Sequence, residues 1–157
     1  MGYDKARALW DDSVNLHRSR YSDGRFPIKP GVQNILEYLH ECGIKIGIAS
    51  SSKKNTVQNQ IGVAGLAQYF DGIVGGDAVK ISKPNPEIYL LACNTFGFIP
   101  EDTFAIEDSV NGIRAAHAAG MRAIMVPDMI PADDEMRSLS ERIFNDLNEV
   151  KEYFQTL

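Results

Sequence analysis

The sequence predicts an α/β fold, in which a mostly parallel sheet is flanked by helices. Short apolar runs alternate along the chain with segments whose apolar residues recur at helical spacing, which is the pattern of βα units. Most of these runs end at glycine, proline or small polar residues, as buried strands do. The 157 residues, of which 44% are hydrophobic and 24% charged, are enough for one domain with a buried core.

The first predicted element is an amphipathic helix over about residues 4–21, where apolar side chains recur at helical spacing. Its acidic pair Asp11-Asp12 follows no apolar strand, so we interpret it as part of a solvated face. The segment 22–30 ends this helix and separates it from the α/β part. Pro30 then suits the first turn of a second helix, where its missing N–H costs nothing.

The remaining elements follow in strict alternation. Strands are predicted at 44–49, 71–74, 103–106, 122–126 and, more weakly, 143–144. Helices are predicted at about 30–42, 53–61, 84–96, 109–119 and 147–154. Four of these helices are followed by a glycine, which is the residue that most readily adopts the left-handed conformation at a helix end: Gly43, Gly62, Gly97 and Gly120. The segment 128–134 is predicted to be a polar loop.

Composition excludes several classes of function. The net charge of −5 and the lack of a Lys/Arg stripe argue against a nucleic-acid partner. No apolar stretch approaches the roughly 20 residues that cross a bilayer, so no membrane partner is expected. The N-terminus is too polar for a secretory signal, and Cys42 and Cys93 form neither a metal motif nor a disulfide framework. We therefore expect a reduced, cytoplasmic protein.

Polar side chains follow three of the predicted strands. Ser50 ends the run 44–49, Lys83 comes shortly after the strand at 71–74, and Glu107-Asp108 directly follows the strand at 103–106. Because the carboxyl ends of parallel strands share one edge of a sheet, we expect these side chains to meet there.

Each of these signals has two interpretations. The hydroxyl of Ser50 and the backbone N–H groups after it can hold a phosphoryl oxygen, or the serines can simply cap a helix. Lys83, next to Pro84, can neutralise a phosphoryl group or lie on the surface. Glu107 and Asp108 can supply oxygen ligands to Mg²⁺, or form an acidic cap for the next helix.

Taken together, the segments resemble the haloacid dehalogenase superfamily, and most closely its sugar-phosphate phosphatases and β-phosphoglucomutases. The resemblance extends over about 29–127 and rests on four segments in order, 46–52 (IGIASSS), 82–89 (SKPNPEIY), 106–116 (IEDSVNGIRAA) and 119–121 (AGM). It implies a Rossmann-like core, and it assigns phosphate binding to Ser50, Ser51 and Lys83. Of these, Ser50 and Lys83 also have catalytic roles in the family, while Asp108 ligates Mg²⁺ and Glu107 supports or shares that role.

The chain departs from the family at its N-terminal end. The family begins with a central strand that carries Asp-x-Asp, whose first Asp becomes an aspartyl phosphate and whose second is the general acid and base. No predicted strand here is followed by Asp-x-Asp. We interpret residues 1–28 as a remnant of the helical cap with its linker, and 29–157 as an N-terminally truncated core.

Loss of the central strand should leave two apolar strand edges unpaired, and exposed edges invite pairing with another chain. We therefore expect the gap to be closed up, filled by a displaced segment, or filled by another chain or a second copy.

The resemblance implies a Mg²⁺-dependent phosphatase or phosphoglucomutase that acts on a small phosphorylated metabolite, such as a sugar phosphate, in the full-length parent. We expect the chain alone to be inactive, because the nucleophile is missing. Two alternatives stay open: a non-catalytic module that binds phosphate and Mg²⁺, and an assembly component completed by another chain.

Overall fold

The computed structural model describes residues 27–157. The helix expected at 4–21 and nearly all of the expected cap remnant at 1–28 therefore lie outside the described residues, and the domain boundary between 28 and 29 stays a prediction. Within 27–157 the chain is an α/β fold with parallel strands, as the sequence predicted. No helix of this part is both long and apolar enough to cross a bilayer.

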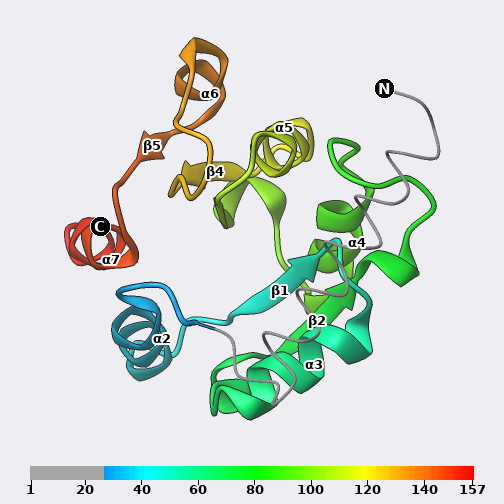
Figure 1. The fold of residues 1–157 in the computed structure, drawn as a ribbon, viewed down its shortest axis with the longest axis vertical. Coiled ribbons are helices and arrows are strands. Elements are labelled where there is room, and N and C mark those ends of the chain that lie inside the picture. The colour runs from blue at the N-terminus through cyan, green and yellow to red at the C-terminus, as the bar shows by residue number, and fades with distance from the viewer. Residues whose placement is uncertain (1–26) are drawn as a thin grey trace, which may run out of the picture.

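The strands form two separate parallel sheets in the described part (Figure 1). One sheet pairs β1 (Gly47–Ser50) with β2 (Gly72–Gly75), and the other has the order β3 (Phe104–Glu107), β4 (Arg122–Met125), β5 (Arg142–Ile143). Each strand falls within three residues of its predicted bounds. Ser50 and Glu107 are the last residues of their strands, so both side chains sit where the sheet gives way to a loop.

Six α-helices and three short 3₁₀ turns connect the described strands. The helices are α2 (Val32–Glu41), α3 (Lys54–Val63), α4 (Glu87–Phe96), α5 (Val110–Ala118), α6 (Asp134–Leu139) and α7 (Leu147–Phe154). The 3₁₀ turns are η1 (Ala67–Tyr69), η2 (Gly76–Ala78) and η3 (Pro100–Asp102).

Two local predictions need correction. Gly62 does not end a helix but lies inside α3, and the left-handed residue after that helix is Gly65, with φ of 70°. Helix α6, which is only six residues long, was not predicted from the sequence. Two features stabilise this helix. The Asp133 carboxylate caps its N-terminus by accepting the N–H of Met136, and the Met136 side chain is fully buried.

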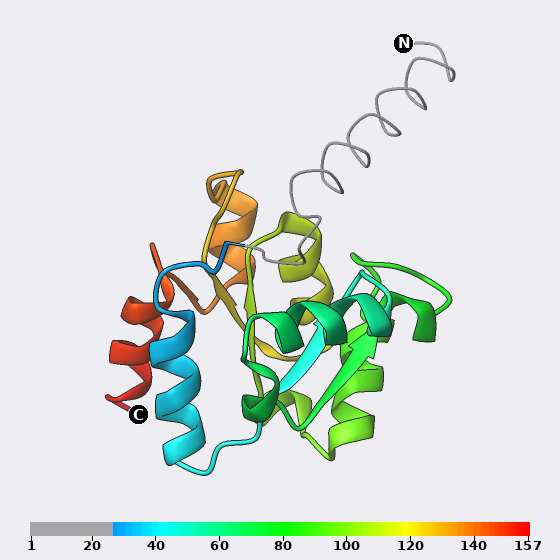
Figure 2. The ribbon, with the colours of Figure 1, turned by 60° about the horizontal axis from the view of Figure 1, so that its bottom comes forward.

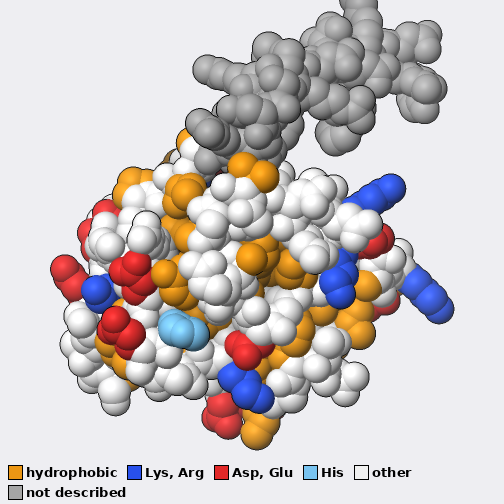
Figure 3. All heavy atoms as spheres, turned by 90° about the horizontal axis from the view of Figure 1, so that it is seen from below, with side chains coloured by type: hydrophobic (Ala, Val, Ile, Leu, Met, Phe, Trp, Pro, Cys, Tyr) orange, Lys and Arg blue, Asp and Glu red, His pale blue; other side chains and the backbone are white. Residues whose placement is uncertain are grey.

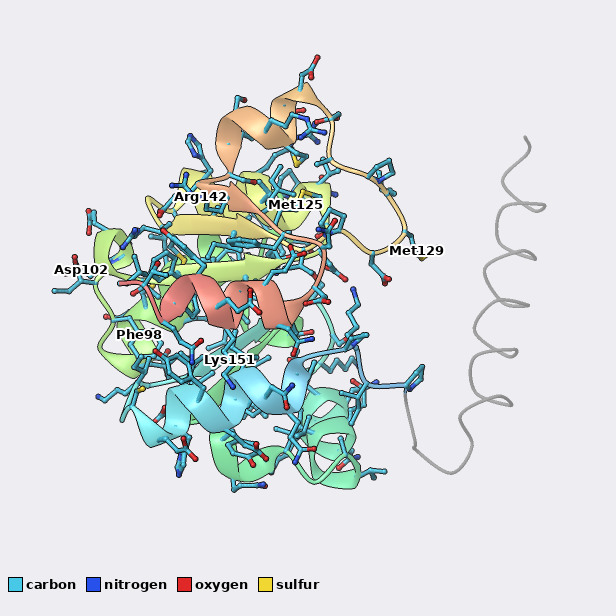
Figure 4. All side chains as sticks on the ribbon, turned by 90° about the vertical axis from the view of Figure 1, so that its left-hand side faces the viewer. Phe98, Asp102, Met125, Met129, Arg142 and Lys151 are labelled. Atoms are coloured by element: carbon cyan, nitrogen blue, oxygen red, sulfur yellow. The ribbon has the colours of Figure 1, made fainter. Side chains whose placement is uncertain are left out.

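Helices cover both faces of the second sheet. Ala105 and Ala123 point into a core shared with Ile113 on α5, whereas Ile124 points into a second core between α2 and α7. Helices α2 and α7 lie side by side (Figure 2), although more than one hundred residues separate their starts. Figure 4 shows Lys151 of α7 beside α2, where its ammonium lies 5.9 Å from the ring centre of Tyr38.

The two sheets do not pair with each other in the described part. A cavity of about 780 Å³ lies between them, and its lining includes Gly47 and Ala49 of β1 and Ala105 and Ile106 of β3. Residues 27–157 leave this gap open and place no strand in it, so the described part does not close it. Filling of the gap by another chain or by a segment outside these residues stays a prediction.

The first sheet is tightly covered by one aromatic ring. Gly47 and Gly72 are partners across the β1–β2 ladder, and an added Cβ at either would lie 2.5 Å from the ring of Phe96. We expect Gly72→Ala to lower the free energy of unfolding by about 1–3 kcal/mol through overpacking, measured by urea denaturation. The matched control is Gly62→Ala, which has open space around it inside a helix and should stabilise. Equal effects of the two substitutions would contradict this packing argument.

A second prediction concerns the contact between β4 and α7. The Glu141 carboxylate accepts two hydrogen bonds of 2.7 Å from Arg122 and one of 2.8 Å from the Tyr153 hydroxyl. The hydrogen bonds from Arg122 lower the pKa of Glu141 and outweigh burial, which raises it, and the hydrogen bond from Tyr153 lowers it further. A lowered pKa stabilises the fold above the unfolded value of about 4.3, and this stabilisation is lost as pH falls through the folded value.

We therefore expect Glu141→Gln to cost about 1 kcal/mol of unfolding free energy at pH 7, a modest value because the pair is partly solvated. The difference from the unmodified chain should vanish below the lowered pKa, where the carboxyl is protonated and resembles the amide. Urea denaturation from pH 3 to pH 7 measures this, and a cost independent of pH would rule it out.

Candidate functional site

The side chains that the sequence analysis expected to converge do so. A cavity of about 430 Å³ lies at the carboxyl ends of β1 and β3, and Ser50, Ser51, Lys83, Glu107 and Asp108 all line it. These residues come from three separate segments of the chain, yet the parallel arrangement of the strands places them at one edge. The structure thus brings together every candidate site residue in one place.

The loop after β1 is held in shape by its neighbours. Ser50 Oγ accepts the N–H of Ser52 at 3.2 Å, which leaves the hydroxyl hydrogen able to donate into the cavity. Helix α3 has Lys53 as its N-cap, without a side-chain cap, so the interpretation of the serines as helix caps is wrong. Asp77 instead accepts the first helical N–H, that of Lys54, at 2.8 Å, and this bond lowers the pKa of Asp77.

Close packing against Gly76 also fixes the conformation of the loop after β1. The N–H of Gly76 donates to Ser52 O at 2.9 Å, and a Cβ added to Gly76 would lie 2.3 Å from Ser51 O. Only glycine allows the backbone to approach this closely. The Ser50–Ser52 backbone is therefore preorganised for whatever the cavity binds.

Lys83 and Glu107 form a buried ion pair in the middle of the site. Their side chains are only 10% and 9% exposed, and Lys83 Nζ donates directly to Glu107 Oε1. The same ammonium lies 3.3 Å from Ala49 O on β1 and 3.1 Å from the Tyr89 hydroxyl. Lys83 therefore links the end of β1 to the end of β3.

The carboxylate of Glu107 is fully engaged in this arrangement. Its Oε1 accepts from Lys83 and from the Tyr89 hydroxyl, and its Oε2 accepts from Ser109 at 3.1 Å. Burial alone would raise the pKa of Glu107, but the Lys83 charge and the three hydrogen bonds outweigh it and hold the pKa below its usual value. Burial and the same carboxylate raise the pKa of Tyr89, so its phenol stays protonated and donates.

Asp108 is the more accessible acid. Its side chain is 53% exposed, and Lys29 Nζ lies 3.5 Å from Asp108 Oδ2 and 3.3 Å from Asp128 Oδ2. The Lys29 ammonium thus lies between the carboxylates of Asp108 and Asp128 at the rim of the cavity. Figure 4 shows the residue after Asp128, Met129, projecting from the loop away from the body of the protein.

The donor set fits a magnesium ion only in part. Mg²⁺ takes one or two carboxylates and completes its six ligands with phosphate oxygens and water. Asp108 offers such an oxygen, whereas Glu107 is taken by its hydrogen-bond donors. Residues 27–157 contain no group of three or more His, Cys, Asp or Glu side chains that could hold a metal ion. Asp108 would therefore be the principal protein ligand in this part of the chain, with Glu107 in support.

Glu107 and Asp108 do not form the acidic helix cap that the sequence also allowed. Helix α5 is capped by Ser109, whose Oγ accepts the N–H of Gly112 at 3.0 Å, so neither Glu107 nor Asp108 is the N-cap. A Cβ at Gly112 would lie 2.0 Å from Glu107 Oε2, which shows how closely the helix approaches the carboxylate. The acids at the end of β3 are thus held at the cavity and not on the helix end.

Sequence reasoning missed four residues of the site. Tyr89 and Ser109 lie inside the recognised segments but were given no role, and their only signal was a hydroxyl next to a charged motif. Lys29 and Asp128 carried no signal, because the ion pair between them joins residues 99 positions apart. Such pairs depend on the fold and cannot be found from local spacing.

Comparison with known proteins places the chain in a family. The family model described as "Haloacid dehalogenase-like hydrolase" matches residues 3–126. The chain is 39% identical over 95 residues to the phosphorylated carbohydrates phosphatase of Thermotoga maritima, with 60% of this chain and 44% of that protein covered. It is 33% identical over 129 residues to hexitol phosphatase B of Escherichia coli K12, with 77% of this chain and 58% of that protein covered.

A solved structure supports the same relationship. The β-phosphoglucomutase of Clostridium difficile superposes with a TM-score of 0.77 and 26% identity, with 99% of this chain and 68% of that chain covered. The chain spans only about half the length of the curated relatives named above. The family model nevertheless covers well over half of the chain, and it includes all three segments that form the site. The chain belongs to the haloacid dehalogenase-like hydrolase family.

Proposed function

We propose that this chain carries the phosphate-binding half of a Mg²⁺-dependent phosphatase for small phosphorylated metabolites, with sugar or sugar-alcohol phosphates as the substrate class. The observation that carries the proposal is the convergence of Ser50, Lys83, Glu107 and Asp108 on one cavity. The relatives named as phosphatases of phosphorylated carbohydrates and of hexitols support the substrate class.

Each residue has a distinct task in this proposal. The Ser50 hydroxyl donates to a phosphoryl oxygen, and the backbone of Ser51 lies beside it. The Lys83 ammonium neutralises negative charge on the phosphoryl group, while Glu107 and Tyr89 hold that ammonium in place. Asp108, released from Lys29, would hold the metal ion, which supplies charge neutralisation at the phosphoryl oxygens when bound.

Two carboxylates of the described residues line this cavity, and neither is free to act as the nucleophile, since Asp108 is assigned to the metal ion. Glu107 is the only buried carboxylate among the lining residues, and its hydrogen-bond donors hold it away from attack. We therefore propose that the 157-residue chain alone has negligible turnover, and that activity requires a strand carrying Asp-x-Asp.

The test compares two proteins. One is the chain itself, and the other is the chain extended at its N-terminus by a segment that carries an Asp-x-Asp strand and a cap. Phosphate release is measured with hexose, hexitol and pentose phosphates, with and without Mg²⁺. We expect release only from the extended protein and only with Mg²⁺. A folded extended protein without any release, or release from the chain alone, would refute the proposal.

A further inference from the structure

The cavity that holds the site residues pairs each of its two carboxylates with a lysine. Glu107 contacts Lys83, and Asp108 contacts Lys29, whose Nζ lies 3.5 Å from Asp108 Oδ2. All four residues line the cavity, and they are the charged residues of its lining in the described part of the chain. Two ammonium groups and two carboxylates balance, so the described lining carries no net charge of its own.

The two pairs differ in how easily they separate. Lys83 and Glu107 are about nine-tenths buried, so water cannot replace either partner. The side chains of Lys29 and Asp108 are 39% and 53% exposed, and such a pair is held only weakly because water solvates both groups. Lys29 is therefore the ammonium that a cation entering the cavity can displace.

A second carboxylate keeps the Lys29 ammonium at the rim of the cavity. Lys29 Nζ lies 3.3 Å from Asp128 Oδ2, slightly closer than Asp108 Oδ2. Asp108 follows β3 and Asp128 follows β4, and the pairing of these strands extends to the bond from the Val126 N–H to Glu107 O at 2.8 Å. The ends of two paired strands thus bring both carboxylates to one ammonium. Lys29 can leave Asp108 and keep a charged partner without crossing the cavity.

The backbone of Lys29 is anchored next to α7. The Val32 N–H donates to Lys29 O at 3.3 Å, so the residues before α2 form a turn. Gly31 in this turn has φ of 83°, and a Cβ added to it would lie 2.6 Å from Asn148 N of α7. Only glycine allows this close approach. Lys29 therefore reaches the cavity from a fixed segment, and its contact with Asp108 follows from the packing of α2 against α7.

We propose that Lys29 is an internal competitor of the metal ion: its ammonium and a divalent cation exchange at the Asp108 carboxylate, and Asp128 retains the ammonium while the cation is bound. Lys29 and Asp128 are thus positioning residues that set how tightly the site binds Mg²⁺. This inference rests on the proposed function, because it takes Asp108 as the metal ligand. It adds two residues that lie outside all four recognised segments.

The exchange weakens metal binding in two ways. Lys29 has to leave Asp108 before a divalent cation can bind there, and its positive charge then stays nearby on Asp128. Removal of the Lys29 charge should relieve both effects. Removal of the Asp128 charge should do the opposite, because Lys29 then keeps Asp108 as its carboxylate partner.

The experiment measures the Kd for Mg²⁺ with the ¹⁵N-labelled chain, by NMR titration in about 0.15 M KCl and without substrate. The amide signals of Asp108 and Ser109 report binding, and Asp108→Asn should abolish their response. We expect Lys29→Met and Lys29→Gln to lower the Kd about tenfold. Lys29→Arg keeps the charge and should leave the Kd at or above that of the unmodified chain. Lys29 is exposed, so these variants should stay folded, and the same spectra show whether they do.

Lys45→Met is the matched control for net charge. Lys45 is exposed and precedes β1, so it lies five residues, or about 16 Å, from Ser50 at the other end of that strand. This separation is about twice the Debye length of about 8 Å at the salt concentration used. The substitution should therefore change the Kd for Mg²⁺ by less than about twofold.

A double-mutant cycle tests the part played by Asp128. In the unmodified chain, Asp128→Asn should raise the Kd for Mg²⁺ about fivefold, because Lys29 loses its alternative partner. In the Lys29→Met background no ammonium has to be retained, so the same substitution should change the Kd by less than about twofold. The difference between the two backgrounds measures the coupling between Lys29 and Asp128.

Four results would overturn the inference. Equal effects of Lys29→Met and Lys45→Met would show that only net charge matters. An effect of Asp128→Asn that is as large without Lys29 as with it would show that Asp128 acts on the metal directly. A response that survives Asp108→Asn, or no binding to Lys29→Met at the highest usable Mg²⁺ concentration, would also exclude the exchange. These affinities are measured without turnover, so their failure is distinguishable from a failure of the extended protein to release phosphate.

Discussion

Replacing Lys83 by methionine is expected to lower the free energy of unfolding by about 3–5 kcal/mol, because it leaves the buried carboxylate of Glu107 without its charge partner. The apolar part of the side chain is kept, so the loss is electrostatic. Lys83 and Glu107 are both about nine-tenths buried, and water cannot replace the missing ammonium. Urea denaturation at pH 7 measures the change.

A double-mutant cycle separates the pair from its surroundings. Glu107→Gln removes the buried charge, so we expect Lys83→Met combined with Glu107→Gln to recover most of the stability lost in Lys83→Met alone. Lys80→Met is the matched control, since Lys80 is exposed and should change stability by no more than about 0.5 kcal/mol. A double variant as unstable as the sum of the single ones would show that the pair is not coupled.

The positions of the strands could be predicted because hydrophobic runs and glycines report directly on local structure. The helix at 147–154 was predicted with its observed bounds, and Gly43, Gly97 and Gly120 have the left-handed φ expected after a helix. The prediction at Gly62 was wrong, because the sequence alone does not distinguish a glycine inside a helix from the glycine that follows one. Its neighbour Gly65 carries the turn.

The convergence of the site could be predicted as well, since it follows from the topology of parallel strands. The hydrogen-bond and ion-pair partners of each site residue could not be predicted. Lys83 was assigned to phosphate, yet its present contacts are Glu107, Tyr89 and Ala49 O, which come from β3, α4 and β1 and meet only in the folded chain. Likewise, Asp108 could be assigned to Mg²⁺ by its motif, but its ion pair with Lys29 depends on the approach of a segment 79 residues away.

The gap between β1 and β3 could also be predicted only in part. A missing central strand could be predicted from the absence of Asp-x-Asp, but closure or filling of the gap could not, because it depends on two competing costs. Bringing β1 against β3 would displace the side chains of α2 and α4 that reach the cavity from its two faces. Leaving the gap open exposes apolar surface and unpaired backbone groups. The described residues show the second outcome.

The second large effect is expected at Ser50, in the extended protein that carries an Asp-x-Asp strand. Ser50→Ala removes a hydroxyl that is aimed at the phosphoryl position by its hydrogen bond from the Ser52 N–H, and we expect kcat/KM for a sugar phosphate to fall by about 10²–10³-fold. A donor that acts on charge developed in the transition state affects kcat, whereas one that only holds the ground state raises KM. Steady-state kinetics at saturating Mg²⁺ distinguish these.

Ser52→Ala provides the matched control for this prediction. It makes the same chemical change two residues along, in a side chain that is exposed and does not line the cavity, and its backbone N–H still donates to Ser50 Oγ. We expect its kcat/KM to stay within about twofold of the unmodified extended protein. If both serines matter equally, the loop acts through its conformation, since a direct contact with phosphate would single out Ser50. If neither matters, the phosphoryl group lies elsewhere in the cavity, and the role of Ser50 proposed above is wrong.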